Sequence, residues 1–451
     1  MNFKKNQILT VDIIDVNMMG FGVAKVDDAV FFVQNAVTGD RALIRVIKAT
    51  KKYYVSRIEE LIQASPYRIE PKCLVFRRCG GCAFQHIGYD LELETKRKYV
   101  ESCFKKAGVF ETDVLPVLST DEVSGYRNKA QFPFAYDEQG KIVAGFFSSR
   151  THKVCSVDQC DIQDPQFSKI MHFVCDFANA ENLTVYDENT GKGLLRHLYL
   201  RSGKNTGEVM LCLVICGSEL PNDRRFVSEL TAAFPQITSI CLNFNTKQTN
   251  VILGDEVQLL WGKEKIVDVL CDRKLYLSPK SFYQVNHDGA ELLYQTAFKM
   301  ALVDQHDLFI DLYCGIGSVS LSLPGNSKIV GVEIIPEAVK DANFNAKENQ
   351  LTSAEYFCGD ASDAFRILTE TDAKNPLVIV DPPRKGLSQS LIADIAAHEI
   401  PKVLYISCGP DTLARDVKLF LDLVYKMSSF QPVDMFPRTS HVESIVLLSR
   451  E

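Results

Sequence analysis

The chain lacks the segments that direct a protein to a membrane or out of the cell. No apolar run approaches the roughly 18–20 residues that a membrane-spanning helix needs, and residues 1–7 are not followed by an apolar signal region. These absences predict a soluble, cytoplasmic protein that does not contact a membrane. In that reducing compartment the fourteen cysteines are expected to be free, metal-bound or catalytic, which excludes a disulfide framework.

The chain also lacks a surplus of basic residues, with 50 Lys and Arg against 57 Asp and Glu and a net charge of −7. The overall charge therefore gives no sign of nucleic-acid binding. The charges are divided unevenly, since residues 1–160 carry 23 basic and 19 acidic side chains and the remainder carries 27 and 38. We expect any polyanion to be bound mainly by the first third, although solvated surface charge alone produces the same asymmetry.

Short strands separated by Gly and Asp turns fill residues 7–62. The pattern predicts a small barrel of the five-stranded OB type over residues 1–64, a fold that commonly binds oligonucleotides. Its stretch "RVIKATKKYYVSR" suits either a phosphate-and-base surface or the charged outer face of a barrel. Residues 65–275 are expected to form a central α/β domain, with a helix over residues 89–106.

Five apolar strands alternate with helical segments in the last third of the chain. They are "DLFIDLYCGIG", "KIVGVEI", "AEYFCGD", "PLVIVDPP" and "KVLYISCGP". The alternation predicts an α/β fold with a doubly wound, Rossmann-like parallel sheet over residues 276–451. Ligands of such sheets lie at the carboxyl ends of the strands, so each polar residue at a strand end is a candidate site residue.

The loop after the first of these strands has Gly315 and Gly317 but lacks the third glycine of the dinucleotide fingerprint. Asp311 precedes it, Glu333 ends the second strand and Asp360 ends the third. An acidic residue at the second strand can accept both ribose hydroxyls, and Asp360 is within reach of an adenine ring. The set favours a nucleoside cofactor without a pyrophosphate, and S-adenosylmethionine fits; an unrelated small ligand is the alternative.

The fourth strand ends in Asp381-Pro382-Pro383-Arg384. Two prolines fix the backbone and remove N–H donors, so the Asp381 carboxylate is held rigidly over the site. Methyltransferases that act on exocyclic amines have a similar tetrapeptide with an aromatic residue in the fourth place. Arg384 occupies that place here, which argues against amine methylation.

Cys408 ends the fifth strand, on the same edge of the sheet as Asp381. Pyrimidine C5 becomes nucleophilic enough to accept a methyl group when a thiolate adds to C6, and a base must then remove the C5 proton. Glu443 precedes a final apolar strand, and His441 points to the same face as either the base or its partner. On pattern alone, a lone buried cysteine is more often inert and a lone glutamate more often solvated.

At this point the sequence resembles the RNA (uracil-5-)-methyltransferases of the TrmA/RumA type, in their ribosomal-RNA branch. The motifs that carry the resemblance span residues 281–444 in the family's order: "SFYQVN", "DLYCGIG", "GVEI", "DPPRKG", "SCGPDTLARD" and "FPRTSHVES". The N-terminal barrel resembles the family's TRAM domain, with "MGFGVAK" as its glycine-rich turn.

The resemblance implies roles for the candidate residues. Cys408 is the implied nucleophile and Glu443 the implied proton acceptor. Residues implied to contact S-adenosylmethionine are Gln284, Tyr313, Gly315, Gly317, Glu333, Asp360 as a looser match, and Asp381. Phe282, Gln284 and Asp381 are implied to border a uracil flipped out of its stack. Ser318 and Gly409 stand where the family often has Asn.

A second group of cysteines lies in the first third of the chain, spaced Cys73-x5-Cys79-x2-Cys82. Either Cys155 or Cys160 can supply a fourth thiolate, and such a set binds zinc or an iron–sulfur cluster. Spacing alone does not separate the two. The family resemblance implies a [4Fe–4S] cluster with Cys160 as the fourth ligand, in a structural role.

The sequence thus predicts a monomeric enzyme that transfers a methyl group from S-adenosylmethionine to uridine C5 in 23S ribosomal RNA, in a domain II hairpin loop, a domain IV site, or both. The barrel and the cysteine group favour the ribosomal branch, because the related transfer-RNA enzymes are expected to lack them. DNA is not an expected partner. The alternatives are methylation of transfer-RNA uridine, methylation of an exocyclic amine, and a non-catalytic RNA-binding assembly factor.

Overall fold

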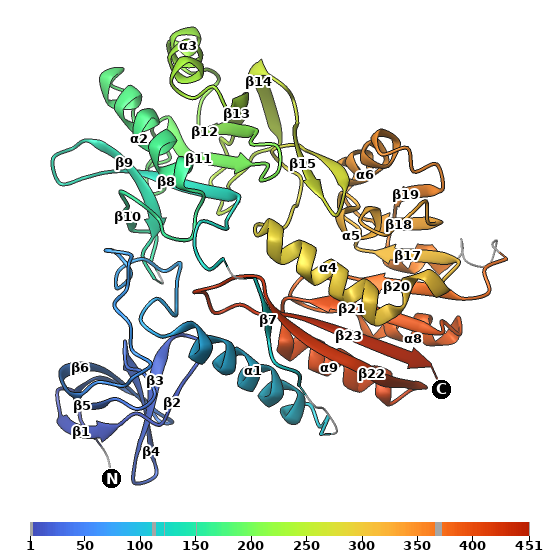
Figure 1. Cartoon of the computed structure of the whole chain (residues 1–451). Helices are drawn as coiled ribbons and strands as arrows, with labels where there is room; N and C mark the ends of the chain where they lie inside the picture. The colour runs from blue at the N-terminus through green and yellow to red at the C-terminus, as the bar shows by residue number, and fades with distance from the viewer. Residues whose placement is uncertain (1–2, 111–113, 121, 150, 366–371, 451) are drawn as a thin grey trace.

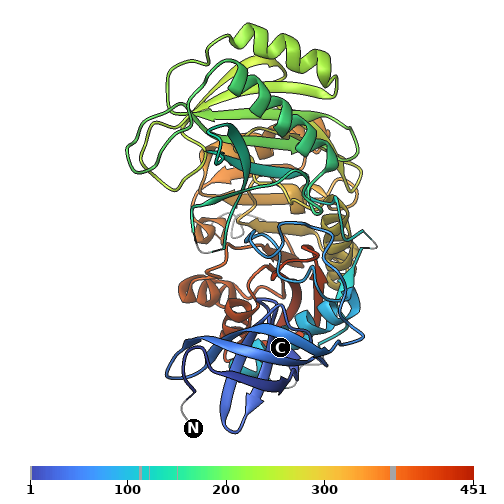
Figure 2. The ribbon, with the colours of Figure 1, turned by 90° about the vertical axis from the view of Figure 1, so that its left-hand side faces the viewer.

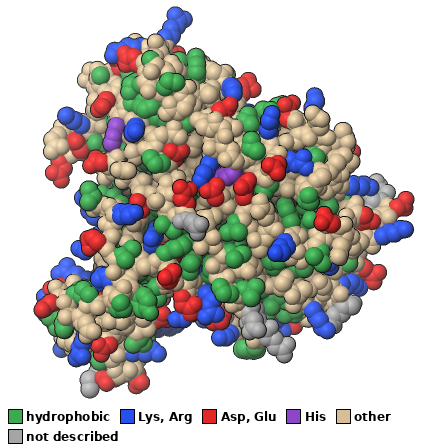
Figure 3. Space-filling view, viewed as in Figure 1, with side chains coloured by type: hydrophobic (Ala, Val, Ile, Leu, Met, Phe, Trp, Pro, Cys, Tyr) green, Lys and Arg blue, Asp and Glu red, His purple; other side chains and the backbone are tan. Residues whose placement is uncertain are grey.

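A computed structural model describes residues 3–110, 114–120, 122–149, 151–365 and 372–450. Three sheets and one separate hairpin succeed each other along the chain (Figure 1). Turned by 90°, the molecule is elongated, with the N-terminal strands at one end, the central sheet at the other and the C-terminal sheet between them (Figure 2). Acidic and basic side chains are interspersed over the face seen in Figure 3 and do not form a patch of one sign there.

The N-terminal sheet has the strand order β1-β5-β6-β4-β3-β2. Its strands are β1 (Ile8–Asp12), β2 (Asp15–Val16), β3 (Phe21–Val26), β4 (Ala29–Gln34), β5 (Arg41–Ala49) and β6 (Tyr54–Gln63). Alternating burial along β5 directs Ala42, Ile44 and Val46 into a small apolar core. Six strands replace the five expected, because the two-residue β2 pairs with β3.

The glycine-rich turn between β2 and β3 is pressed against the segment that follows the cysteine triplet. Gly20 has a φ of 72°, and a Cβ at this position would overlap the carbonyl oxygen of Ala83. Only glycine combines this backbone conformation with so close an approach. The turn therefore joins the N-terminal sheet to the cysteine segment rather than facing solvent.

The central sheet has the order β10-β9-β8-β11-β12-β13-β14. Its strands are β8 (Lys129–Tyr136), β9 (Ile142–Phe147), β10 (Val154–Ser156), β11 (Leu195–Ser202), β12 (Val209–Ile215), β13 (Ile237–Phe244) and β14 (Glu256–Gly262). One apolar core lies between this sheet and the helices α2 (Pro165–Ala180) and α3 (Asp223–Ala233). Residues of the opposite face, such as Tyr199 and Met210, share a core with the hairpin β15 (Ile266–Leu270) and β16 (Arg273–Leu277).

The C-terminal sheet has eight strands in the order β19-β18-β17-β20-β21-β23-β22-β7. They are β17 (Leu308–Leu312), β18 (Ile329–Glu333), β19 (Ala354–Cys358), β20 (Pro376–Val380), β21 (Lys402–Ser407), β22 (Tyr425–Asp434), β23 (Glu443–Arg450) and β7 (Leu118–Ser119). The first five in this order are parallel, as predicted. The sheet as a whole is mixed, because β23 runs antiparallel to both β21 and β22.

Helices cover both faces of the C-terminal sheet, which confirms the α/β class. One core includes residues of α4 (His287–Ala301) and α6 (Pro336–Glu348). The other includes residues of α8 (Gln389–Ala397), α9 (Pro410–Leu421) and α1 (Tyr89–Lys106). The short elements α5 (Ser318–Leu321), η1 (Val303–Gln305) and η2 (Ala361–Asp363) complete the described elements.

Helix α1 has the bounds predicted for it, but it packs on the C-terminal sheet together with β7. A buried ion network attaches it there. Lys96 Nζ lies 2.8 Å from Glu92 Oε1, 2.7 Å from Asp434 Oδ1 and 3.2 Å from the carbonyl oxygen of Phe436. Arg438 pairs with Glu92, and burial raises the pKa of Glu92 against the attraction of Lys96. Two cations thus balance two carboxylates where the β22–β23 loop begins.

Within the described residues, no helix is both long and apolar enough to cross a lipid bilayer.

We expect Lys96→Met to destabilise the protein strongly, because the side chains of Lys96, Glu92 and Asp434 are all fully buried. Breaking such a pair costs about 3–5 kcal/mol, which lowers the first thermal unfolding midpoint by roughly 6 °C or more. Lys98→Met is the matched control, since Lys98 is 53% exposed and lies 3.8 Å from its partner Glu94. A surface pair of that kind contributes about 0–1 kcal/mol. Equal midpoints for the two variants in calorimetry would contradict the role given to the network.

Candidate active site

The candidate residues of the C-terminal sheet gather where its parallel strands end. Register pairs Leu312 with Val380 and Val380 with Tyr405, so the segments after β17, β20 and β21 leave the sheet side by side. Tyr313, Asp381 and Cys408 follow these strands by one or two residues. The parallel arrangement therefore brings together the side chains that the strand-end pattern had selected.

The loop after β17 depends on residues with positive φ. Tyr313, Gly315 and Gly317 have φ of 66°, 54° and 80°, a conformation that a side chain disfavours and glycine accepts. Glu333, at the end of β18, accepts hydrogen bonds from the backbone N–H of Gly315 at 3.2 Å and of Ile335 at 3.0 Å. Its carboxylate therefore fixes the glycine loop against the second strand.

Asp311 is 1% exposed, and within the described residues neither carboxylate oxygen has a hydrogen-bond partner. Burial raises its pKa to about 7, with Glu333 adding to the shift and the nearby Ser320 opposing it. Burial, with a contribution from Asp311, likewise raises the pKa of Asp381 to about 7. The two buried carboxylate oxygens of Asp311, without a hydrogen-bond partner among the described residues, indicate a ligand that carries donor groups.

Asp360 lies at the end of β19 as predicted, but its side chain is already engaged. It caps the helix η2 by accepting from the N–H of Ser362 at 3.1 Å. The N–H of Asp360 in turn donates to Asp363 at 2.9 Å. This reciprocal cap holds the carboxylate in an exposed position at the edge of the site.

Cys408 and Glu443 meet because β21 and β23 pair antiparallel. Ser407 is opposite Ser444, so the next residue of β21 and the preceding residue of β23 lie across from each other. Glu443 is 3% exposed, whereas Cys408 is half-buried and accessible. The pairing places a thiol and a carboxyl group from distant parts of the chain at one edge.

The charges around Cys408 disfavour its thiolate. Burial raises the pKa of the thiol to about 11, and Glu443 and Asp381 add to the shift. Arg384 opposes them, through its charge and a hydrogen bond to the thiol. Burial also raises the pKa of Glu443 well above its usual range, with Asp381 adding and Arg384 opposing.

His441 differs from Glu443 in basicity. Burial lowers the pKa of His441 to about 4, and the cations Arg384, Arg127 and Lys96 lower it further. The imidazole is therefore neutral at neutral pH and a weaker base than the Glu443 carboxylate. Of the two roles open to His441, that of partner fits better than that of base.

The loop between Asp381 and Ser388 is tied to α9. Thr412 Oγ1 donates to the carbonyl oxygen of Arg384 at 3.0 Å. The buried Asp416 accepts from the N–H of Leu387 at 2.8 Å and from the hydroxyl of Tyr405 at 2.7 Å. These bonds hold the proline-containing loop across the turn that carries Cys408.

The segment before α4 separates an exposed aromatic side chain from buried polar ones. Phe282 is 63% exposed, whereas Tyr283 and Gln284 are buried. Tyr283 donates to Asp268 at 2.9 Å, and the carbonyl oxygen of Gln284 accepts from Asn128 at 3.0 Å. Gln284 is therefore held on the active-site side, with Phe282 free to contact a partner.

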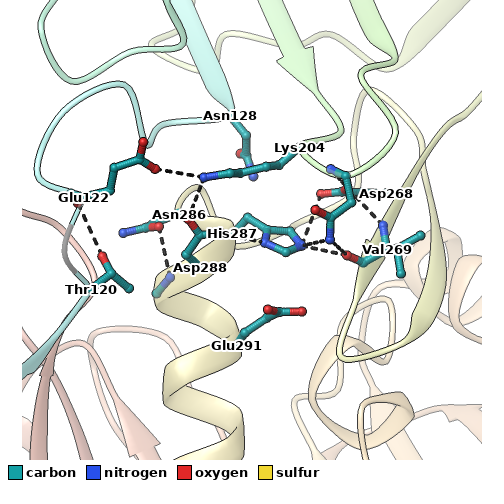
Figure 4. A network of polar contacts seen from close by, with 12 residues as sticks. Thr120, Glu122, Asn128, Lys204, Asp268, Val269, Asn286, His287, Asp288 and Glu291 are labelled. Carbon is teal, nitrogen blue, oxygen red and sulfur yellow. Dashed lines mark hydrogen bonds and ion pairs between the residues drawn. The ribbon is translucent and has the colours of Figure 1, made fainter.

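A polar network at the start of α4 braces this segment against the central sheet (Figure 4). Lys204 pairs with Glu122 at 2.9 Å and with Asp288 at 2.5 Å. His287, 1% exposed in its side chain, contacts the carbonyl oxygen of Val269 at 2.7 Å. The network joins the β11–β12 turn, the β15–β16 hairpin and α4.

Sequence reasoning missed Tyr294 on α4. It is fully buried, lies 3.4 Å from the Ser318 hydroxyl and faces Gln284 and Asp381. Tyr294 thus lies beside Ser318 and two candidate site residues, Gln284 and Asp381. A tyrosine at core spacing in a helix gives no signal that separates it from an ordinary core residue.

The four cysteines predicted as ligands surround one cavity of about 300 Å³ between the cysteine segment and the central domain. Its lining includes Cys73, Cys79, Cys82 and Cys160. Burial raises the pKa of each thiol, to about 11 for Cys79, and neighbouring thiols add to the shifts of all four. Cys155 is close to this group but does not line the cavity.

Other features of the cavity bear on what it can hold. Arg127 Nε and Gln163 Oε1 are buried without hydrogen-bond partners, and both residues line it. Nowhere in the described chain do three or more Cys, His, Asp or Glu side chains lie close enough to hold a metal ion. The arrangement of these side chains therefore does not support the predicted [4Fe–4S] ligand set.

Comparisons with known proteins agree over most of the chain. The family model described as tRNA (Uracil-5-)-methyltransferase matches residues 88–451. A protein of Halalkalibacterium halodurans named "Uncharacterized RNA methyltransferase" is 40% identical over 446 residues, which cover 98% of this chain and 97% of that protein. A Bacillus cereus protein of the same name is 39% identical over 449 residues, with 99% and 97% covered.

The fold is also similar to the crystal structure of the Pyrococcus abyssi tRNA (uracil-54, C5)-methyltransferase in complex with S-adenosyl-L-homocysteine. The TM-score is 0.78 and the identity 27%, and the match covers 98% of this chain and 100% of the other. It includes the N-terminal sheet and the cysteine segment. The expectation that transfer-RNA enzymes lack the N-terminal sheet is therefore wrong for this relative.

Proposed function

This chain belongs to the tRNA (uracil-5-)-methyltransferase family, and we propose from this premise that it methylates C5 of a uridine in 23S ribosomal RNA through a covalent Cys408 adduct. The observation that carries the proposal is the pairing of Cys408 with the buried Glu443 across β21 and β23. A thiol and a base at one edge are what C5 methylation of a pyrimidine requires.

In this mechanism Cys408 Sγ adds as thiolate to C6 of the flipped uracil, which moves electron density to C5. S-adenosylmethionine, when bound, supplies the electrophilic methyl group that C5 attacks. Glu443 then takes the C5 proton, and the resulting C5–C6 double bond expels the Cys408 thiolate. Half-buried Asp381 and buried Gln284 hold the base in place, and Phe282 covers it from the solvent side.

The ligand site of the methyl donor extends from the glycine loop to Asp381. Glu333 accepts the two ribose hydroxyls, with Tyr313 and the glycines 315 and 317 around the amino-acid part and Asp360 at the adenine edge. The unpartnered oxygens of Asp311 support a ligand with donors, such as the α-amino group. The complex of the Pyrococcus relative with S-adenosyl-L-homocysteine supports the same ligand class.

Glu333→Gln is expected to weaken binding of S-adenosyl-L-homocysteine about 10- to 100-fold in isothermal titration calorimetry. The substitution removes charge-assisted hydrogen bonds of about 1.5–3 kcal/mol. Glu337→Gln is the matched control, since Glu337 is exposed in the first turn of α6. If both variants bind like the wild type, Glu333 is not the ribose ligand.

Cys408→Ala is expected to abolish both methylation and the covalent complex with 5-fluorouridine RNA, because no other thiol faces Glu443. Glu443→Gln keeps the thiol and removes the base, so the complex with ordinary uridine RNA forms but its turnover slows by about 10²–10⁴-fold. Denaturing gel electrophoresis separates the complex from free protein.

Cys216→Ala, directly after β12 of the central sheet, serves as a control that forms the complex normally. Complex formation by Cys408→Ala would refute the nucleophile, and methylation by it would favour amine chemistry. Absence of both the complex and methylation in the wild type would favour a non-catalytic RNA-binding factor.

We also infer that Cys73, Cys79, Cys82 and Cys160 hold a [4Fe–4S] cluster in the 300 Å³ cavity. The common cavity of the four thiols supports the proposal, as does Arg127 Nε beside them, which has no hydrogen-bond partner among the described residues. A cluster with four thiolate ligands has no open iron and ties the cysteine segment to the central domain. The remaining chemistry of the site does not depend on it.

Protein purified without oxygen should be brown and contain about four irons per chain. Cys79→Ser is expected to lose the colour and most of the iron. Cys155→Ser should retain both, because Cys155 does not line the cavity. A colourless wild type that contains zinc would overturn the assignment of the cluster. If Cys155→Ser loses the iron, Cys155 rather than Cys160 is the fourth ligand.

The choice of ribosomal RNA rests on the cysteine group, which the resemblance assigns to the ribosomal branch, because the N-terminal sheet has a counterpart in the Pyrococcus transfer-RNA enzyme. We propose that the sheet acts as a TRAM-like RNA-binding barrel. Transfer-RNA uridine is the second candidate, because the match to the Pyrococcus tRNA (uracil-54, C5)-methyltransferase extends over these same parts.

A further inference from the structure

The thiol of Cys408 has to ionise, yet its surroundings oppose ionisation. Two carboxyl groups face it, Glu443 from β23 and Asp381 from the end of β20, and burial adds to their effect. Arg384 is the cation that faces the thiol, from the loop after β20. Of these three charged groups, Arg384 alone favours the thiolate.

The backbone of Arg384 is fixed directly beside the nucleophile. Thr412, in the first turn of α9, donates to the carbonyl oxygen of Arg384 at 3.0 Å and to that of Gly409 at 3.0 Å. Thr412 therefore links the loop of Arg384 to Gly409, the residue that follows Cys408. A Cβ at Gly409 would lie 3.4 Å from the Arg384 carbonyl oxygen and 2.8 Å from Thr412 Oγ1. Glycine at this position allows the loop to approach so closely.

His441 holds the guanidinium from the other side. Arg384 Nη2 lies 3.5 Å from His441 Nδ1 and 3.4 Å from Nε2. The guanidinium is thus about equally far from both ring nitrogens, at the long end of the hydrogen-bond range. The ring also packs edge-on against Phe436 at 5.9 Å and lines the cysteine cavity.

We propose that Arg384 is the group that stabilises the Cys408 thiolate, and that His441 is a positioning residue that holds Arg384 over the thiol. The need for a Cys408 thiolate rests on the proposed function. The contacts among Arg384, His441 and Cys408 do not involve RNA. The thiol proton passes to the buffer, and Arg384 remains protonated throughout because its pKa lies far above neutrality. His441 acts as a neutral ring, so the positioning of Arg384 does not depend on protonation of the imidazole.

Stabilisation of the Cys408 thiolate by Arg384 explains why position 384 is arginine in this chain. An aromatic residue here would stack on a base but would leave Cys408 facing only negative charge. A lysine would supply the charge without the planar group that lies against the imidazole. His441 also forms part of the wall of the cysteine cavity. The packing of the residues around this cavity therefore influences the position of the Arg384 guanidinium.

The test measures alkylation of Cys408 in the intact protein by iodoacetamide between pH 7 and 10, with RNA absent. Trypsin cleaves after Lys402 and Arg415, and Cys408 is the only cysteine in the peptide 403–415, so mass spectrometry reports this thiol among fourteen. Arg384→Gln is expected to slow alkylation about three- to tenfold, because loss of a facing cation raises the thiol pKa by about one unit while the remaining thiolate is more nucleophilic.

The other variants separate positioning from general damage. Arg384→Lys should recover part of the lost rate, and His441→Gln should slow alkylation in the same direction by a smaller factor. The double variant Arg384→Gln/His441→Gln should react no more slowly than Arg384→Gln alone, because His441 acts through Arg384. Lys385→Gln removes a charge from the adjacent exposed position and should react like the wild type.

Alkylation of Arg384→Gln within twofold of the wild type would overturn the inference, as would an additive effect of His441→Gln in the double variant. These outcomes are distinct from failure of the proposed function. A wild type that does not methylate RNA but shows the predicted alkylation pattern would refute uridine methylation and leave the role of Arg384 standing.

Discussion

Strands β21 and β23 run antiparallel, and the register that pairs Ser407 with Ser444 brings Cys408 and Glu443 to one edge of the C-terminal sheet. A slip of one residue would turn every side chain of β23 to the opposite face and separate the two groups. The buried ion network of Lys96, Glu92, Asp434 and Arg438 attaches helix α1, far away in sequence, to the segment that leads into β23.

Burial of like charges is the second constraint on the site. Asp311, Asp381 and Glu443 all have raised pKa values, and each is buried largely without cationic partners. Such an arrangement costs stability and is typical of functional sites. It leaves the carboxyl groups able to accept donors from ligands, and it makes the one facing cation, Arg384, decisive for the Cys408 thiol.

The sequence predicted the parts of the fold that depend on local patterns. Apolar strands with polar ends identified Asp311, Glu333, Asp381 and Cys408 at one edge, because parallel strands end together. Helix α1 was predicted with its bounds, but its packing on α9 and β22 was not, since an amphipathic pattern does not name its partner. The pairing of β7 with β22 and the cap formed by Asp360 likewise depend on contacts that a single sequence does not encode locally.

The same limit applies within the site. In the sequence, Tyr294 has the spacing of an ordinary core residue, and only the structure shows its contact with Ser318. The contact of Arg384 with His441 joins two motifs that are 57 positions apart. The cysteine spacing predicted a ligand triplet, and the family resemblance added Cys160, but neither indicated that the cavity wall would include His441. The link between that cavity and the nucleophile is therefore visible only in three dimensions.

The most direct measurement is mass-spectrometric mapping of 5-methyluridine in 23S ribosomal RNA and in transfer RNA from cells with and without this protein. We expect at least one 23S uridine to lose its methyl group in its absence and to regain it when the wild-type chain, but not Cys408→Ala, is restored. Unchanged 5-methyluridine throughout 23S ribosomal RNA would contradict the account, and a loss confined to transfer RNA would assign the same chemistry to the other substrate.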